Sequence, residues 1–122
     1  MNDRSWLTQD SYTHYYEVLD WHSVEWQTAW PQLIQDVHLI LEAADVLVQG
    51  PLDAGNELLS PVVDVKDGIC FNGVANDRHE DFRLSELWDD FSVKTLQKPY
   101  DVAVSCVLIR AHVLAPNQIQ IG

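Results

Sequence analysis

The sequence predicts an α+β fold in which a three-stranded antiparallel meander packs against two or three helices. Apolar residues recur every 3.6 residues over positions 26–48 and every second residue over positions 62–84. A nearly continuous apolar run at 102–115 predicts a buried helix in the C-terminal half. With 122 residues, 47% of them hydrophobic, we expect a single domain over 1–122 with a core of its own.

The N-terminal third is predicted to hold two helices. Between Ser11 and Asp20, aromatic and aliphatic residues three and four apart predict a short amphipathic helix. A long helix follows, capped by Asp20 or Ser23 and ended by Gly50 and Pro51. Its apolar positions are Trp26, Trp30, Leu33, Ile34, Val37, Leu41, Ala44 and Val48. Pro31 either kinks this helix or begins a new one in its first turn.

The central segment is predicted to form the meander. Its strands are Val62 to Lys66, Ile69 to Ala75 and Arg78 to Leu84, joined by two-residue turns at Asp67-Gly68 and Asn76-Asp77. Those turns place Phe71 opposite Phe82 and Ile69 opposite Leu84, on one apolar face with Val62. The wetter face then carries Val65, Asn72, Val74, His79, Asp81 and Arg83.

The C-terminal segment is predicted to hold a helical turn, a buried helix and a strand. Ser85 to Phe91 suits a helical turn. Pro99 to Ala115 is apolar on nearly all sides, so we expect a central core helix buried on most sides. Gln118 to Ile121 alternates like a short strand.

The bulk features predict a soluble cytoplasmic protein. Cys70 and Cys106 lack C-x-x-C spacing and lie in apolar runs, so we expect free, buried thiols in a reducing compartment. The first residues lack the basic and apolar regions of a signal peptide, and no run approaches 18 apolar residues. We therefore expect no membrane partner.

Part of the chain resembles a family of small uncharacterised bacterial α+β proteins. Lys94-Thr95-x-x-Lys98-Pro99-Tyr100-Asp101 before an apolar helix carries the likeness, with Phe71-Asn72-Gly73, His79-Glu80 and Phe82 upstream. The likeness covers about residues 68 to 122. The resemblance implies no activity and no catalytic residue.

The charge distribution gives the leading functional hypothesis. Residues 5–65 contain no lysine or arginine and carry ten carboxylates of a chain with net charge −12. We expect the acids of the long helix, Asp36 among them, to have no cation to pair them. Such a surface attracts basic proteins and repels nucleic acid. We therefore expect a binding module of the immunity-protein, antitoxin or nucleic-acid-mimic type. Its candidate partner-binding residues are Trp21, Glu25, Asp36, Glu42 and Asp45.

Two alternatives remain open. A small-molecule site, enzymatic or not, would use a pocket beside Tyr100, Arg110 and His112, and a homodimer would pair the strand Gln118 to Ile121 with its copy. Histidines near carboxylates lack an H-E-x-x-H spacing, and no nucleophile, glycine-rich loop or other catalytic motif is present. We expect no metal, no cofactor and no catalytic residue. The segment Lys94 to Asp101 either binds an anion at the helix start or serves the fold.

Overall fold

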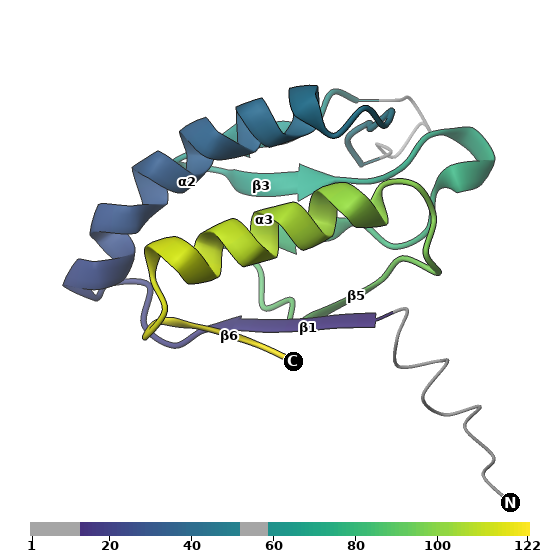
Figure 1. Cartoon of the computed structure of the whole chain (residues 1–122). Helices are drawn as coiled ribbons and strands as arrows, with labels where there is room; N and C mark the ends of the chain where they lie inside the picture. The colour runs from purple at the N-terminus through teal and green to yellow at the C-terminus, as the bar shows by residue number, and fades with distance from the viewer. Residues whose placement is uncertain (1–12, 52–58) are drawn as a thin grey trace, which may run out of the picture.

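The computed structural model of the chain describes residues 13–51 and 59–122, which form two helices and two three-stranded antiparallel sheets (Figure 1). The strand orders are β5-β1-β6 and β2-β3-β4. This confirms the α+β class and the three-stranded meander, whereas the sheet built around β1 was not predicted. The elements are β1 (Thr13–Val18), α2 (Val24–Ala43), β2 (Val62–Asp64), β3 (Gly68–Phe71), a 3-10 turn (Ala75–Asp77), β4 (Phe82–Leu84), β5 (Ser92–Lys94), α3 (Asp101–Leu114) and β6 (Ile119–Ile121).

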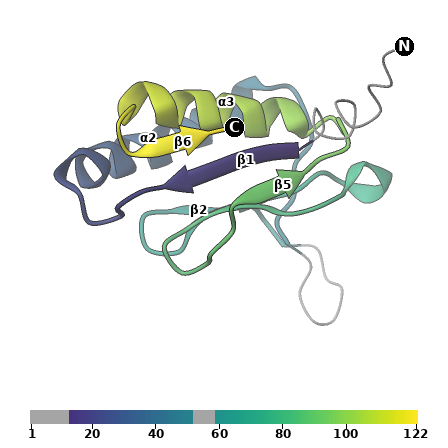
Figure 2. The ribbon, with the colours of Figure 1, turned by 90° about the horizontal axis from the view of Figure 1, so that it is seen from below.

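The two helices pack against each other and fill the inner side of the two sheets (Figures 1 and 2). The sheets meet where β4 and β5 come together. There the Glu80 N–H donates to the Lys94 carbonyl at 3.3 Å, and the Tyr16 hydroxyl donates to the Arg83 carbonyl at 2.7 Å. The largest fully buried side chains come from both helices and both sheets: Trp26, Tyr100, Phe71, Phe82, Leu33, Ile69, Leu108, Ile119, Val37, Val93, Val104 and Val107. One core therefore serves all the elements.

The first described element is a strand, so the helix predicted between Ser11 and Asp20 is wrong from residue 13 onward; residues 11 and 12 lie outside the described ranges. Burial alternates along it, with Tyr16 only 3% exposed and its neighbour Tyr15 47% exposed. Thr, Tyr and Val favour a pleated, half-buried surface. The strand is stabilised by pairing with β5 and β6, which lie near the other end of the chain.

Helix α2 begins as predicted and ends early. Ser23 is its cap, since its hydroxyl accepts a hydrogen bond from the Trp26 N–H at 3.1 Å. One helix runs through Pro31, which lies in its interior rather than in a first turn. The helix stops at Ala43, not at Gly50, and Asp45 adopts a left-handed φ of 55°. The following segment is irregular, and its Gln49 forms a bridge with Asn72.

The meander has the predicted register between β3 and β4 but not between β2 and β3. Ile69 lies opposite Leu84 and Phe71 opposite Phe82, as expected. In the first hairpin Val63 lies opposite Ile69, where the predicted two-residue turn would place Lys66. Val63, and not the predicted Val62, packs on the core. The predicted turn at Asp67-Gly68 is too short, because Gly68 is already the first paired residue of β3. A slip of one residue moves a side chain to the other face of a sheet.

The connection from β3 to β4 is longer than the two-residue turn predicted at Asn76-Asp77. It passes through the 3-10 turn, and Asn72, expected on the wet face, is 2% exposed. The segment from Ser85 to Phe91 forms a turn and not a helix, with the Leu87 N–H donating to the Ser85 hydroxyl at 3.1 Å. It leads into β5, which was not predicted.

Helix α3 and strand β6 lie where the sequence predicted them, but one side of α3 is left uncovered. Val102, Ile109 and Val113 are 51%, 63% and 61% exposed, because α2 and the strands cover only part of the helix. Cys106 is exposed and Cys70 half-buried, so the predicted burial of both thiols is wrong; both are unpaired. Among the described residues, no helix combines the length and apolar composition needed to cross a bilayer.

Candidate functional site

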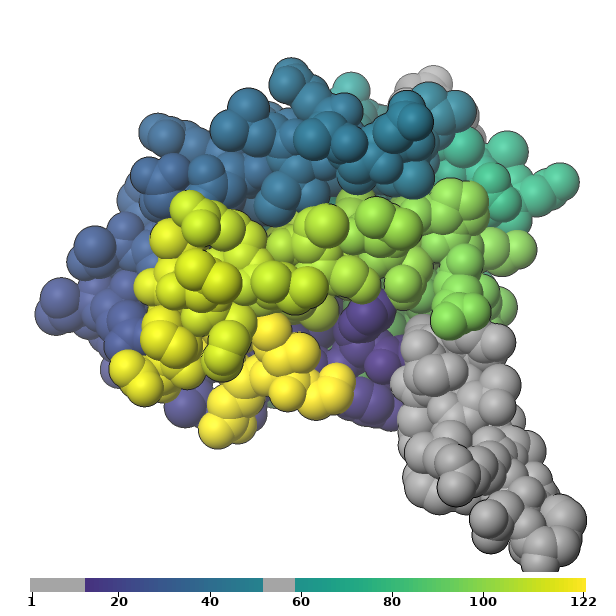
Figure 3. Space-filling view, in the orientation of Figure 1, coloured from purple at the N-terminus to yellow at the C-terminus, as the bar shows by residue number. Residues whose placement is uncertain are grey.

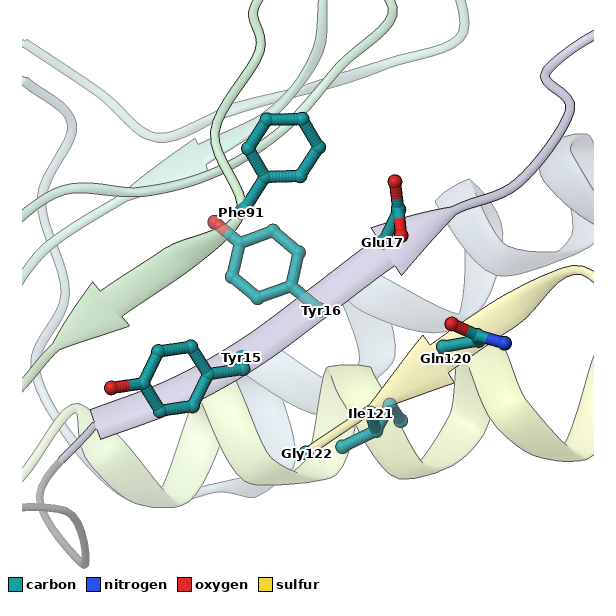
Figure 4. Close-up of a pocket in the computed structure, with 7 residues that line it drawn as sticks. All are labelled: Tyr15, Tyr16, Glu17, Phe91, Gln120, Ile121 and Gly122. Carbon is teal, nitrogen blue, oxygen red and sulfur yellow. The ribbon is translucent and has the colours of Figure 1, made fainter.

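The outer side of the β5-β1-β6 sheet, facing away from the helices, carries an open groove of about 550 Å³ (Figure 4). Strand alternation sends Tyr16 toward the core and leaves Tyr15 and Glu17 exposed. Phe91 lies beside β1, where its carbonyl accepts the Tyr16 N–H at 2.9 Å. The lining residues are Tyr15, Tyr16, Glu17, Phe91, Gln120, Ile121 and Gly122.

A second hollow, of about 210 Å³, extends this groove toward the turn that precedes β5. It shares Tyr16, Glu17 and Phe91 with the first hollow and adds Trp21, Trp88 and the carboxylates Asp89 and Asp90. We call the combined surface the aromatic groove and define it by Tyr15, Glu17, Trp21, Trp88, Asp89 and Phe91. Tyr15, Trp88 and Phe91 are 47%, 55% and 56% exposed. Exposed aromatic rings of this kind are enriched at protein interfaces.

The aromatic groove is negatively charged. Glu17 and Asp89 are exposed, and neither has an ion-pair partner within the described part of the chain. Arg83 adds no free positive charge, because its guanidinium contacts the Asp90 carboxylate at 2.5 Å. The same guanidinium lies 4.8 Å from the Trp88 ring centroid and so holds that ring in place. The groove thus combines apolar rings with uncompensated carboxylates.

The structure does not bring the five predicted partner-binding residues together. Trp21 is half-buried, packs edge-on against Trp26 and Trp30 at 5.3 and 5.1 Å, and lines the second hollow. Glu25 lies in the first turn of α2, and its carboxylate accepts hydrogen bonds from the backbone and side chain of Asn117.

The other three predicted residues lie farther along α2 and just beyond it. The Asp36 carboxylate contacts the Arg110 guanidinium at 2.7 Å, and that hydrogen bond lowers the pKa of Asp36. The expectation that Asp36 has no cation is therefore wrong, because α3 supplies one across the helix pair. Glu42 and Asp45 are exposed where α2 ends.

The predicted pocket residues Tyr100, Arg110 and His112 have separate surroundings. Tyr100 is fully buried, its hydroxyl donates to the Glu80 carbonyl at 2.6 Å, and burial raises its pKa. Arg110 pairs with Asp36. Only His112 lines a groove, which has a volume of about 660 Å³ and lies between α3 and β6.

The segment Lys94 to Asp101 contributes to the fold at the start of α3. The Thr95 hydroxyl donates to the Asp101 carboxylate, which also contacts His14 Nε2 at 2.7 Å. Thr95 is fully buried, and residues 96 and 97 both adopt left-handed backbone angles. These contacts tie β1, β5 and the helix start together.

The upstream part of the same pattern also builds structure. The Asn72 amide donates to the His79 carbonyl and to the Asp81 carboxylate, at 2.9 and 2.8 Å. Its oxygen accepts from the backbone N–H groups of Gly73 and His79. A side chain at Gly73 would overlap the Asp77 carbonyl, since its Cβ would lie 2.1 Å from that oxygen. Asn72 therefore fixes the long connection between β3 and β4.

The groups that line the aromatic groove bind by apolar contact, stacking and charge. The half-buried Cys70 thiol does not line this groove but a neighbouring cleft that shares Trp88 with it, and burial raises the pKa of the thiol to about 12. Within residues 13–51 and 59–122, no three His, Cys, Asp or Glu side chains are grouped so that they could hold a metal ion.

Sequence reasoning missed Trp88, Asp89 and Phe91 as surface residues. It placed this segment, Ser85 to Phe91, on a helical turn. The available signal was a pair of aromatic residues, Trp88 and Phe91, flanking two carboxylates a few residues after a predicted strand. Their exposure follows from β5, whose pairing with β1 carries the preceding turn to the outer side of the sheet.

No protein-family model, no curated protein and no solved structure matches this chain, so its resemblance to small bacterial α+β proteins stays a prediction.

Proposed function

We propose that this chain is a protein-binding module that docks on a basic surface of a partner protein through the aromatic groove. One observation carries the proposal: three rings about half exposed, Tyr15, Trp88 and Phe91, lie on one hollowed surface with uncompensated carboxylates. Desolvated aromatic anchors supply affinity, while carboxylates at the rim steer a cationic partner and set its orientation.

The charge of the groove argues for a basic occupant. Glu17 and Asp89 face solvent there, and Arg83 is neutralised by Asp90. The long acidic half adds a field of the same sign, which raises the rate at which cationic partners arrive. Nucleic acid would be repelled by the same field.

The experiment has two steps, because the partner is not identified. The full chain, tagged at its N-terminus, is exposed to an extract of its source cell, and proteins retained at about 0.3 M salt are identified by mass, since such salt screens non-specific attraction. The retained protein is then purified and its affinity for groove variants is measured by calorimetry. We expect a protein with a basic surface, bound about 10- to 100-fold more weakly by Trp88→Ala and by Phe91→Ala.

Matched controls separate the groove from general acidity. Glu17→Gln removes a groove carboxylate and should slow association, whereas Glu42→Gln removes an equal charge at the end of α2 and should have little effect. Leu47→Ala truncates a residue that is 76% exposed away from the groove and serves as the control for Phe91→Ala. Retention of an acidic protein, or equal losses in groove and control variants, would contradict the proposal.

A further inference from the structure

The exposed face of α3 carries apolar residues and no carboxylate. Val102, Ile109 and Val113 are more than half exposed, Cys106 is exposed between them, and His112 is the remaining exposed residue of the helix. We call Val102, Cys106, Ile109 and Val113 the α3 stripe. Figure 3 shows α3 running across the side of the molecule turned to the viewer, with no other element over it. An apolar stripe of this length on an acidic protein indicates an interaction surface.

The groove beside α3 continues this surface. It has a volume of about 660 Å³ and is lined by Ile109, His112, Val113, Pro116, Ile119, Gln120 and Ile121. Ile121 is 42% exposed at the free side of β6, the edge strand of its sheet. The stripe and this groove together form one surface without a carboxylate, which meets the groove on the outer side of the sheet only at Gln120 and Ile121 of β6.

We propose that the α3 stripe is the contact between two copies of this chain, packed as an antiparallel helix pair about a two-fold axis. The spacing of the stripe, four, three and four residues, is that of a helix–helix seam. This spacing is symmetric about its midpoint, so a second copy in antiparallel orientation places Cys106 opposite Ile109 and Val102 opposite Val113.

The charge distribution favours a second copy of this chain as the molecule that binds the α3 stripe. Two chains of net charge −12 repel each other wherever carboxylates meet. No exposed residue of α3 is acidic, and Arg110 beside the stripe is already neutralised by Asp36. A basic partner of the kind proposed for the aromatic groove would find no carboxylate on this face to bind. None of the four stripe residues lines the aromatic groove, so dimerisation through them would not occupy it.

Sedimentation equilibrium on the full chain tests this proposal directly. At about 100 μM, a concentration that populates dimers with micromolar dissociation constants, we expect the mass of a dimer. Ile109→Glu would bury two unpaired carboxylates in the contact and should weaken dimerisation by at least about 100-fold. Val24→Glu introduces the same charge at a residue 84% exposed at the start of α2 and should leave the dimer intact.

Thiol cross-linking gives an independent measurement on chains without an added charge. A short bismaleimide should join two wild-type chains through Cys106, and Cys70→Ser should behave in the same way. Cys106→Ser should abolish the product, which keeps the proposal testable if Ile109→Glu does not fold. A wild-type monomer at about 100 μM would overturn the proposal, and so would a dimer that persists in Ile109→Glu and does not cross-link at Cys106. Binding through the aromatic groove can survive either outcome, so the two proposals fail separately.

Discussion

Arg83 illustrates how this chain uses its few cations. Its guanidinium pairs with Asp90 and stacks on Trp88, so one residue both removes a positive charge from the aromatic groove and holds a ring at its rim. Arg78 pairs with Asp81 and Arg110 with Asp36 in the same manner. Only some carboxylates of the negative surface are therefore neutralised by an arginine. Others, such as Glu17 and Asp89, have no ion-pair partner among the described residues.

The pair of Asp36 and Arg110 gives a pH-dependent prediction. The arginine lowers the pKa of Asp36 below its ordinary 3.8, so the pair stabilises the fold above that value and is lost as the pH falls through the lowered pKa. Asp36→Asn should reduce the free energy of unfolding at pH 7 by about 0.5–1 kcal/mol. Urea titrations from pH 7 to about pH 3 give the free energy of unfolding of both proteins. The difference in this free energy between Asp36→Asn and wild type should shrink below about pH 4. A difference that is constant over this range would contradict the assignment.

At the scale of elements, β1 shows why local pattern was misleading. Tyr12, Tyr15, Tyr16 and Leu19 satisfy a helical spacing, yet the segment from Thr13 is a strand. An aromatic-rich segment of this length suits either structure, and its strand partners at Ser92–Lys94 and Ile119–Ile121 decide the outcome. For the start of α2 the local signals suffice, because a capping residue and a long apolar period agree with each other, but they place its end too late.

Pro31 in the interior of α2 predicts a stabilising substitution. Pro31 is exposed, and its backbone nitrogen carries no hydrogen. It therefore cannot donate the hydrogen bond that a helix residue at this position gives to the Gln27 carbonyl. Pro31→Ala should restore that bond and raise the free energy of unfolding by about 1–3 kcal/mol in urea titrations. Gln35→Ala, one turn later on the exposed side, is the control and should change it by less than about 0.5 kcal/mol. An unchanged or lowered value for Pro31→Ala would show that the helix depends on the proline.

At the scale of the whole molecule, the fold separates three kinds of surface. The outer side of the β5-β1-β6 sheet is aromatic and acidic, α3 presents an uncharged apolar face, and the end of α2 carries exposed acids. The net charge of −12 remains the dominant long-range property. It opposes compaction, since like charges repel most when the chain is folded.

This repulsion predicts that salt stabilises the protein. Raising sodium chloride from about 20 mM to about 0.5 M shortens the screening length from tens of ångströms to a few and should raise the melting temperature. The double variant Glu42→Gln, Asp45→Asn removes two exposed carboxylates. In calorimetric scans its melting temperature should rise less with salt than that of wild type. A melting temperature that falls with salt would mean that ion pairs outweigh repulsion.

The sequence by itself determined the features that depend on local pattern. These are the α+β class, the start of α2 near Asp20 or Ser23, the pairing of Phe71 with Phe82, and the positions of α3 and β6. In each case the signal lies within a single helix, a hairpin or the composition, so no distant partner is needed to read it.

Tertiary structure alone decided the rest. The sheet around β1 joins segments from both ends of the chain, and Arg110 reaches Asp36 only because α2 and α3 pack side by side. The aromatic groove and the α3 stripe likewise exist because particular faces are left uncovered. Exposure is a property of how elements cover one another, which a spacing of residues along the chain does not encode.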